Sequence, residues 1–450
     1  MEDLTRLLPP DVLADVLRRL ESPRRLAASR SVCKAWRDII DAYRLLRTDL
    51  LPLSLGGIFT YIHGTDLPKY FSPVSSETIA PFDYLGTHDV ESLTIMQHCN
   101  GLLLLGEEEV RVLNPATRQW VCLPSPPPMF TPCMEDAHEI ISSCTTDHDM
   151  YLVFDPMMSS EFKIFLIKYV PNHPSPDCNQ LAKPEVHARE WPPSTFVFLV
   201  FSSETMEWEE KPFIREGDAA GTVGHMFQVD TPRHCYATYW RGALYVHQHD
   251  FLMRITLAGS KYQVIKLPTG LHEIEYDYSY VGKSEKGVYY TSLYGYDGLR
   301  YGYNGYGLRV WFLDESRGHM KWDLKCEVNL KPLLANFPWK CNDKPWALRH
   351  GNDDHSYLSR VLMEENFDWG FDYYNPHEPV YIPRRYAISL LGFHPNKEVV
   401  FFHTPSKRVV AYHFDSSKIE DLGFLPTEHP GDVYISFPYM PCRTGDLSDN

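Results

Sequence analysis

The sequence predicts a mainly β protein that carries a small all-α module at its N-terminus. Between Leu8 and Ile40, apolar residues recur at the spacing of amphipathic helices. Beyond Pro52, short runs of Val, Ile, Phe, Tyr and Trp alternate with clusters of Gly, Pro, Asn and Asp, which is typical of strands and turns. These runs recur as similar units, so we expect a repeat architecture. With 450 residues and 44% hydrophobic content, the chain has enough material for a small and a large domain.

The N-terminal module is expected to hold three short helices. One apolar helical face is formed by Val12, Leu13, Val16, Leu17 and Leu20. Ser22 followed by Pro23 is typical of a helix start, so a second helix should carry Leu26. The apolar pattern returns at Val32 and continues through Trp36. About 35 residues bury too little surface for a stable domain, so a neighbour or another protein should cover part of it.

The β part repeats a unit that is clearest between Cys99 and Pro124. A strand follows Asn100-Gly101, a second ends near Asn114, and a third carries Trp120. Variants of this unit recur at 151–165, 196–208, 240–268, 286–322 and 398–423. A meander of this kind cannot bury its faces alone.

Radial stacking of such meanders predicts a β-propeller of about six four-stranded blades, with roughly 40 to 57 residues per repeat. The stretch from Leu330 to Arg385 is either a divergent blade or a long loop, and the sequence leaves both possibilities open. We further predict that Gly57–Ile62 is a strand that closes the ring with the C-terminal repeat.

Charge and cysteine usage narrow the class of protein. A net charge of −16 argues against nucleic acid as a partner, since such binding needs clustered Lys and Arg. The N-terminus does not have the pattern of a secretory signal, and no segment has the roughly 20 apolar residues that span a bilayer. Ten cysteines without a CxxC pair favour reduced thiols over a disulfide or metal pair at Cys133 and Cys144. We expect a cytoplasmic or nuclear protein without a membrane partner.

Two sequence patterns are candidate binding sites. His247 and His249 would lie on the same side of a strand at a spacing that suits a metal, but no third ligand can be named, so no metal and no cofactor are expected. A Tyr- and Gly-rich stretch is either a recognition loop or a lengthened hairpin. Its tyrosines are Tyr294, Tyr296, Tyr301, Tyr303 and Tyr306. No hydrolase, metalloprotease or catalytic cysteine motif is present, so we expect no catalytic residues.

The N-terminal motif resembles the F-box, the helical module by which substrate receptors join SCF-type ubiquitin ligases. The resemblance is carried by Leu8-Pro9-x-Asp11, Val16-Leu17, Leu20, Leu26 and Val32-Cys33-Lys34-x-Trp36-Arg37. The link from Leu20 to Leu26 is longer than usual and has Glu21-Ser22 where Leu-Pro is common.

The β repeats resemble the kelch-like, propeller-type F-box-associated domain of plant F-box proteins. The unit from Val112 to Trp120, followed by Leu123-Pro124, carries this resemblance. Together the two resemblances imply an F-box at 1–48, a linker at 49–56 and an interaction domain at 57–445.

The resemblance implies a non-catalytic substrate receptor that binds a Skp-type adaptor, and through it a cullin and a RING protein, while the β domain binds an unidentified target protein. The implied adaptor-binding residues are Leu8, Pro9, Val12, Val16, Leu17, Leu20, Leu26, Val32 and Trp36. An alternative for this apolar face is that it simply packs the helices. Alternatives for the whole chain are a propeller enzyme similar to kelch-type oxidases, with an appended helical module, and an F-box scaffold that does not direct degradation.

Overall fold

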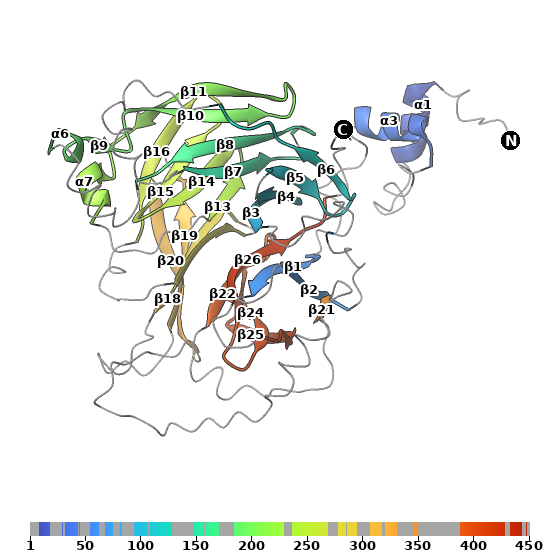
Figure 1. The fold of residues 1–450 in the computed structure, drawn as a ribbon. Helices are drawn as coiled ribbons and strands as arrows, with labels where there is room; N and C mark the ends of the chain where they lie inside the picture. The colour runs from blue at the N-terminus through green and yellow to red at the C-terminus, as the bar shows by residue number, and fades with distance from the viewer. Residues whose placement is uncertain are drawn as a thin grey trace.

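The computed structural model describes most of the strands and two of the N-terminal helices (Figure 1). The described residues are 9–18, 29, 32–43, 45, 55–62, 68–74, 82, 94–106, 109–127, 148–156, 158–170, 184–228, 236–268, 278–284, 286–294, 307–316, 320–330, 346–349, 388–427, 433–442 and 447. For Arg18 and a few other residues at the ends of helices and strands, the structure describes the backbone only.

Helices form only a small part of the described chain. The N-terminal helices are α1 (Pro10–Arg18) and α3 (Lys34–Ala42). Proline at the first position of α1 suits a helix start, because its missing N–H would have no intrahelical partner there, and Asp11 adds a favourable negative charge to the first turn. Two further single-turn helices, α6 (Pro184–His187) and α7 (Val223–Met226), lie beside the two-stranded sheet of β9 (Glu190–Trp191) and β12 (Gly221–Thr222).

Four sheets have four antiparallel strands each. The first, in spatial order, contains β21 (Trp346–Arg349), β2 (Lys69–Pro73), β1 (Gly57–Ile62) and β26 (Val433–Tyr439). The second contains β3 (Thr94–Cys99), β4 (Leu102–Gly106), β5 (Arg111–Asn114) and β6 (Gln119–Cys122). The third contains β17 (Tyr278–Lys283), β18 (Val288–Tyr294), β19 (Gly307–Asp314) and β20 (Lys321–Asn329). The fourth contains β22 (Ser389–Phe393), β23 (Val399–His403), β24 (Arg408–His413) and β25 (Lys418–Phe424).

The fifth large sheet has eight strands and joins two four-stranded meanders. One meander contains β7 (His148–Phe154), β8 (Phe162–Lys168), β10 (Thr195–Ser202) and β11 (Glu207–Glu216). The other contains β13 (Ala237–Trp240), β14 (Ala243–Gln248), β15 (Phe251–Thr256) and β16 (Lys261–Lys266). Parallel pairing of β11 with β16, from Ile214 opposite Lys261, joins them, and the two end strands β7 and β13 also contact each other, so the sheet is nearly closed. The prediction of a mainly β domain after an N-terminal helical module is confirmed. The strand pairing does not show the six separate four-stranded sheets of the predicted propeller, because two meanders are joined in one eight-stranded sheet.

Local sequence accounts for the hairpins of the clearest unit. Asn100 and Gly101 both have positive φ values, 47° and 94°, which Asn and Gly tolerate best and which suit the tight turn between β3 and β4. The side chain of Asn114 accepts a hydrogen bond from the backbone N–H of Ala116 at 3.1 Å, an Asx turn that leads from β5 into β6. The predicted strands and turns of this unit are therefore confirmed.

Recurring tryptophans tie neighbouring sheets together. The indole N–H of Trp208 in β11 donates to the carbonyl oxygen of Pro124, just after β6, at 2.8 Å. Trp322 in β20 makes the same kind of bond to the carbonyl oxygen of Lys266, the last residue of β16, at 2.9 Å. In each case the outer strand of one meander is tied to the end of the outer strand of the preceding meander.

The first and last strands of the β domain pair with each other. β1 is antiparallel to β26, with Thr60 opposite Ser436. The prediction that Gly57–Ile62 forms a strand is confirmed, but its partner strand lies beyond the last predicted unit at 398–423, which forms a separate sheet. A close approach requires glycine at the start of β1, because a Cβ on Gly57 would lie 2.6 Å from the carbonyl oxygen of Phe71. On the other side of this sheet, β21 pairs with β2, so the stretch between Leu330 and Arg385 contributes a strand.

Six strands form a closed chain of contacts at the centre of the β domain. β3 contacts β7, β7 contacts β13, and β13 contacts β17. β17 contacts β22, and β22 contacts β26. The circuit is completed by His98 in β3 and Phe437 in β26, whose ring centroids are 4.9 Å apart. Residues distant in sequence are thereby brought together around one centre.

We predict that Thr60→Pro lowers the free energy of unfolding by about 2 to 4 kcal/mol, because β1 has a partner strand on each side and proline removes a backbone donor there. Equilibrium denaturation measures the loss. The matched control is Lys325→Pro, because Lys325 lies at an irregularity of the edge strand β20, where proline is tolerated. Equal losses in the two variants would contradict the central position of β1.

We also predict that stability falls as pH falls from about 6.5 to about 4. Burial lowers the pKa of His403 from 6.5 to about 4, so the unfolded chain binds a proton over this range while the folded chain does not. The neutral ring donates from Nε2 to the carbonyl oxygen of Leu425, 3.2 Å away. Chemical denaturation across this pH range should show that His403 accounts for on the order of 3 kcal/mol of the loss. His403→Gln should remove that part, and an unchanged slope in this variant would contradict the assignment.

Candidate functional site

The helices α1 and α3 pack against each other through a small apolar core. Its buried members are Leu13, Ala14, Leu17, Ile40 and Leu45, with Trp36 and Ile39 partly buried beside them. The chain after α3 is held by the backbone N–H of Leu45, which donates to the carbonyl oxygen of Ile40 at 2.8 Å. The helix pair is thus fixed by contacts between a few side chains.

A second apolar stripe on α1 faces away from this core. Val12 and Val16 are one helical turn apart and are 42% and 48% exposed, whereas Leu17 beside them is fully buried. Val32, just before α3, is 64% exposed, and Pro9 is exposed as well. These exposed residues, Pro9, Val12, Val16 and Val32, are called the apolar helical surface below. Among the described residues, no other segment presents two such valines on one helix.

The structure divides the predicted adaptor-binding residues into groups. Pro9, Val12, Val16 and Val32 are exposed, while Leu17 belongs to the core and Trp36 is partly buried against it. The Trp36 indole N–H is buried and has no hydrogen-bond partner among the described residues. The remaining predicted residues, Leu8, Leu20 and Leu26, lie outside the described part of the chain.

The sequence of this helical segment matches a known family. Residues 5–50 match the family model described as F-box-like. The chain carries an F-box-like domain. This domain contains both α1 and α3, so the exposed valines belong to it.

Comparison of the whole chain with curated proteins and solved structures assigns no function to it. No curated protein matches the sequence. Among solved structures, AztD from Citrobacter koseri is similar with a TM-score of 0.32 and 9% identity, covering 84% of this chain and 97% of that one. A DUF4784 family protein from Bacteroides caccae has a TM-score of 0.34 and 9% identity, covering 85% and 74% of the two chains. Such low scores support no inference about fold or function. None of the described helices has the length and apolar character needed to cross a membrane.

The described residues include only the start of the Tyr- and Gly-rich stretch. Tyr294 is the last residue of β18, and the following strand β19 begins at Gly307. The other four predicted tyrosines, Tyr296, Tyr301, Tyr303 and Tyr306, lie outside the described residues. Both the recognition loop and the lengthened hairpin therefore stay predictions.

The two histidines of the considered metal pair do not share a strand. β14 ends at Gln248, and His249 lies in the following turn with a positive φ of 39°, so the expected placement on the same side of a strand is wrong. Both rings are buried, and Nε2 of His249 lies 2.5 Å from the carbonyl oxygen of Val170. Within the described part of the chain, no group of three or more His, Cys, Asp or Glu residues is arranged to hold a metal.

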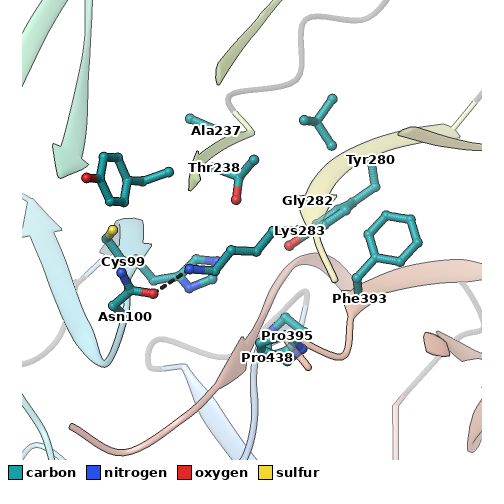
Figure 2. A pocket seen from close by; sticks show the side chains of 13 residues that line it. Cys99, Asn100, Ala237, Thr238, Tyr280, Gly282, Lys283, Phe393, Pro395 and Pro438 are labelled. Atoms are coloured by element: carbon teal, nitrogen blue, oxygen red, sulfur yellow. Dashed lines mark hydrogen bonds between the residues drawn. The ribbon is translucent and has the colours of Figure 1, made fainter. Parts of the chain in front are cut away.

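A small pocket with polar and apolar lining lies at the centre of the contact circuit of the β domain (Figure 2). It has a cavity of about 40 Å³ and is lined by residues from β3, β13, β17 and β22 and by Pro438 of β26. Lys283, the last residue of β17, extends toward Asn100, and its Nζ donates to the Asn100 side-chain oxygen. Asn100 in turn donates from Nδ2 to the carbonyl oxygen of Phe154 at 2.6 Å. This links β17, the β3–β4 turn and β7.

Burial shapes the ionisation of the groups in this pocket. It lowers the pKa of Lys283, although the negative charges of Cys99, when ionised, and Asp155 act in the opposite direction. Burial and the positive charge of Lys283 lower the pKa of His98 to about 4, and burial raises the pKa of the Cys99 thiol to about 11. Sequence reasoning missed these residues, because a lysine at a strand end and a histidine within a strand are common on protein surfaces.

Proposed function

We propose that this chain is the substrate-recognition subunit of an SCF-type ubiquitin ligase. In this proposal the F-box-like domain binds a Skp-type adaptor, and through it a cullin and a RING protein, while the β domain binds the target protein. The observation that carries the proposal is the apolar helical surface within the F-box-like domain. An apolar surface on so small a helical module favours a protein partner.

The finer architecture of the β domain is part of the proposal. We regard the sheets as the blades of a six-bladed propeller, in which the two meanders of the eight-stranded sheet are separate blades joined at their outer edges. The circuit of contacts among β3, β7, β13, β17, β22 and β26 supports this interpretation. The Trp208 and Trp322 bonds between successive meanders support it as well. The likeness of the repeats to the kelch-like associated domain of plant F-box proteins stays a prediction.

The proposed mechanism is positional and needs no catalytic group on this chain. A receptor that binds adaptor and target at the same time raises the local concentration of the target's lysines near the charged ubiquitin-conjugating enzyme. The bond chemistry then belongs to the other subunits. The cytoplasm and the nucleus are the compartments in which we expect this assembly.

We predict that Val12→Ala together with Val16→Ala weakens adaptor binding by about 3 kcal/mol, or about 100-fold in Kd, because each change removes about two buried methyl groups. Titration of the full chain with a purified Skp-type adaptor measures this. Both valines are exposed in the free chain, so the variant should fold normally. The matched control is Met158→Ala, a change at an exposed apolar residue of the β domain, which should leave Kd unchanged. An unchanged Kd in the double variant would refute the proposed interface.

A second experiment separates a degradation receptor from a scaffold. Proximity labelling of the intact chain and of the Val12→Ala, Val16→Ala variant should lose ligase subunits in the variant and keep the target proteins. If the chain directs degradation, the targets of the intact chain should accumulate when the proteasome is inhibited, whereas those of the variant should not change. Partners whose abundance is insensitive to the inhibitor would favour the scaffold alternative.

A further inference from the structure

The central pocket contains an amine in an unusual setting. Lysines in protein interiors are commonly paired with a carboxylate, which stabilises the ammonium ion. The hydrogen bond of Lys283 described here is instead to the neutral amide oxygen of Asn100. That amide is itself held in place by its hydrogen bond to the carbonyl oxygen of Phe154.

The other groups around the pocket also leave the amine available. Asp155 is close enough to influence the pKa of Lys283, but it is bonded to the Tyr239 hydroxyl as well. His98 is neutral at pH 7, because its pKa is about 4, and can exchange protons through either ring nitrogen. Burial of Lys283 disfavours its charged form, so a larger fraction of this amine is in the nucleophilic free-base form than for a lysine in water.

The cavity limits which molecules can reach Lys283. Its volume of about 40 Å³ compares with the 10 to 15 Å³ that one water molecule needs on the same measure, so it has room for about three non-hydrogen atoms. Figure 2 shows the side chains of Tyr280, Phe393 and Pro438 around the same space as Lys283 and Thr238. A small molecule with one polar end and one apolar end fits such a lining.

We propose that Lys283 is a site of reversible covalent modification by small aldehydes that enter this central pocket. The free amine of Lys283 attacks the carbonyl carbon, a C–N bond forms, and the carbonyl oxygen takes up a proton to give a carbinolamine. The nitrogen loses one proton, which makes the carbinolamine neutral. It then loses its second proton as the C–O bond breaks and the hydroxyl group takes up a proton and leaves as water, which gives an imine. The overall change is amine plus aldehyde to imine plus water, and no oxidant or reductant is consumed.

The neighbouring thiol does not compete for the aldehyde. Sγ of Cys99 donates to the carbonyl oxygen of Phe154 and accepts from the N–H of the same residue, both at 3.3 Å. With a pKa of about 11 the thiol stays protonated at pH 7, and the protonated thiol is a poor nucleophile. The reactive atom of this pocket is therefore Nζ of Lys283. The inference goes beyond the proposed function and does not depend on adaptor binding.

The test is reductive labelling of the full chain with acetaldehyde and cyanoborohydride at pH 7, followed by peptide mapping. Lys283 should be labelled faster than Lys321, since burial lowers the pKa of Lys283 and leaves more of its amine in the free-base form. Lys321 is a suitable internal reference, because its side chain is 78% exposed and pairs with Asp323 at 3.4 Å. Labelling of Lys283 that is no faster than that of Lys321 would overturn the proposal.

Two variants sharpen the result. Asn100→Asp places a carboxylate beside Nζ and should slow labelling of Lys283 about tenfold or more while Lys321 is labelled as before. Lys283→Arg should abolish labelling at position 283, with near-ultraviolet circular dichroism and thermal melting as checks of folding. If either variant fails to fold, the comparison of Lys283 with Lys321 in the unaltered chain still decides.

A larger aldehyde tests the cavity itself. Pyridoxal is too large for a space of about 40 Å³ and should label Lys321 but not Lys283. Labelling of Lys283 by pyridoxal at the rate found for acetaldehyde would show that the amine is reached from open solvent, and would overturn the assignment of the pocket as the site.

Discussion

The β domain depends on the pairing of its first strand with its last. β1 and β26 are separated by the whole length of the domain, so their pairing closes a very long loop at an entropic cost that grows only slowly with length. The cost is offset by an aromatic cluster at the junction, where the Phe59 ring lies 4.6 Å from Tyr70 and 5.3 Å from Tyr439, centroid to centroid. Without this closure, β1 and β22 would each lose a neighbour, and the circuit of contacts would be open.

The central pocket is a direct consequence of closure. It collects His98 from one end of the domain and Pro438 from the other, and it places Lys283 between them. Lys283 reaches Asn100 only because β17 and the β3–β4 turn lie on the same circuit. The pocket therefore depends on the same strand pairing that stabilises the domain.

Local structure could be predicted from the sequence where its cause is local. The Asn100-Gly101 turn, the Asx turn at Asn114 and the strands beside them follow from residue preferences within a few positions. The parallel joining of β11 to β16 and the position of β21 could not be predicted, because they depend on packing between segments far apart in the chain. On α1 the apolar spacing identified the apolar residues of the helix but not which of them are buried against α3. Val12–Val16 and Leu13–Leu17 are adjacent stripes about 100° apart on one helix, and only the position of α3 decides which stripe is buried.

The contrast between the two parts of the chain bears on how the protein works. The β domain buries large apolar clusters of its own, which stabilise it without a partner. The F-box-like domain buries few side chains in its described core and leaves Val12, Val16 and Val32 in solvent. A partner that covers these valines would add apolar contacts at little cost in conformational entropy, since the short, branched side chain of valine has little rotamer freedom to lose. The weakly buried module is thus suited to reversible assembly, and the closed β domain is suited to hold its own surface unchanged whether or not that assembly has formed.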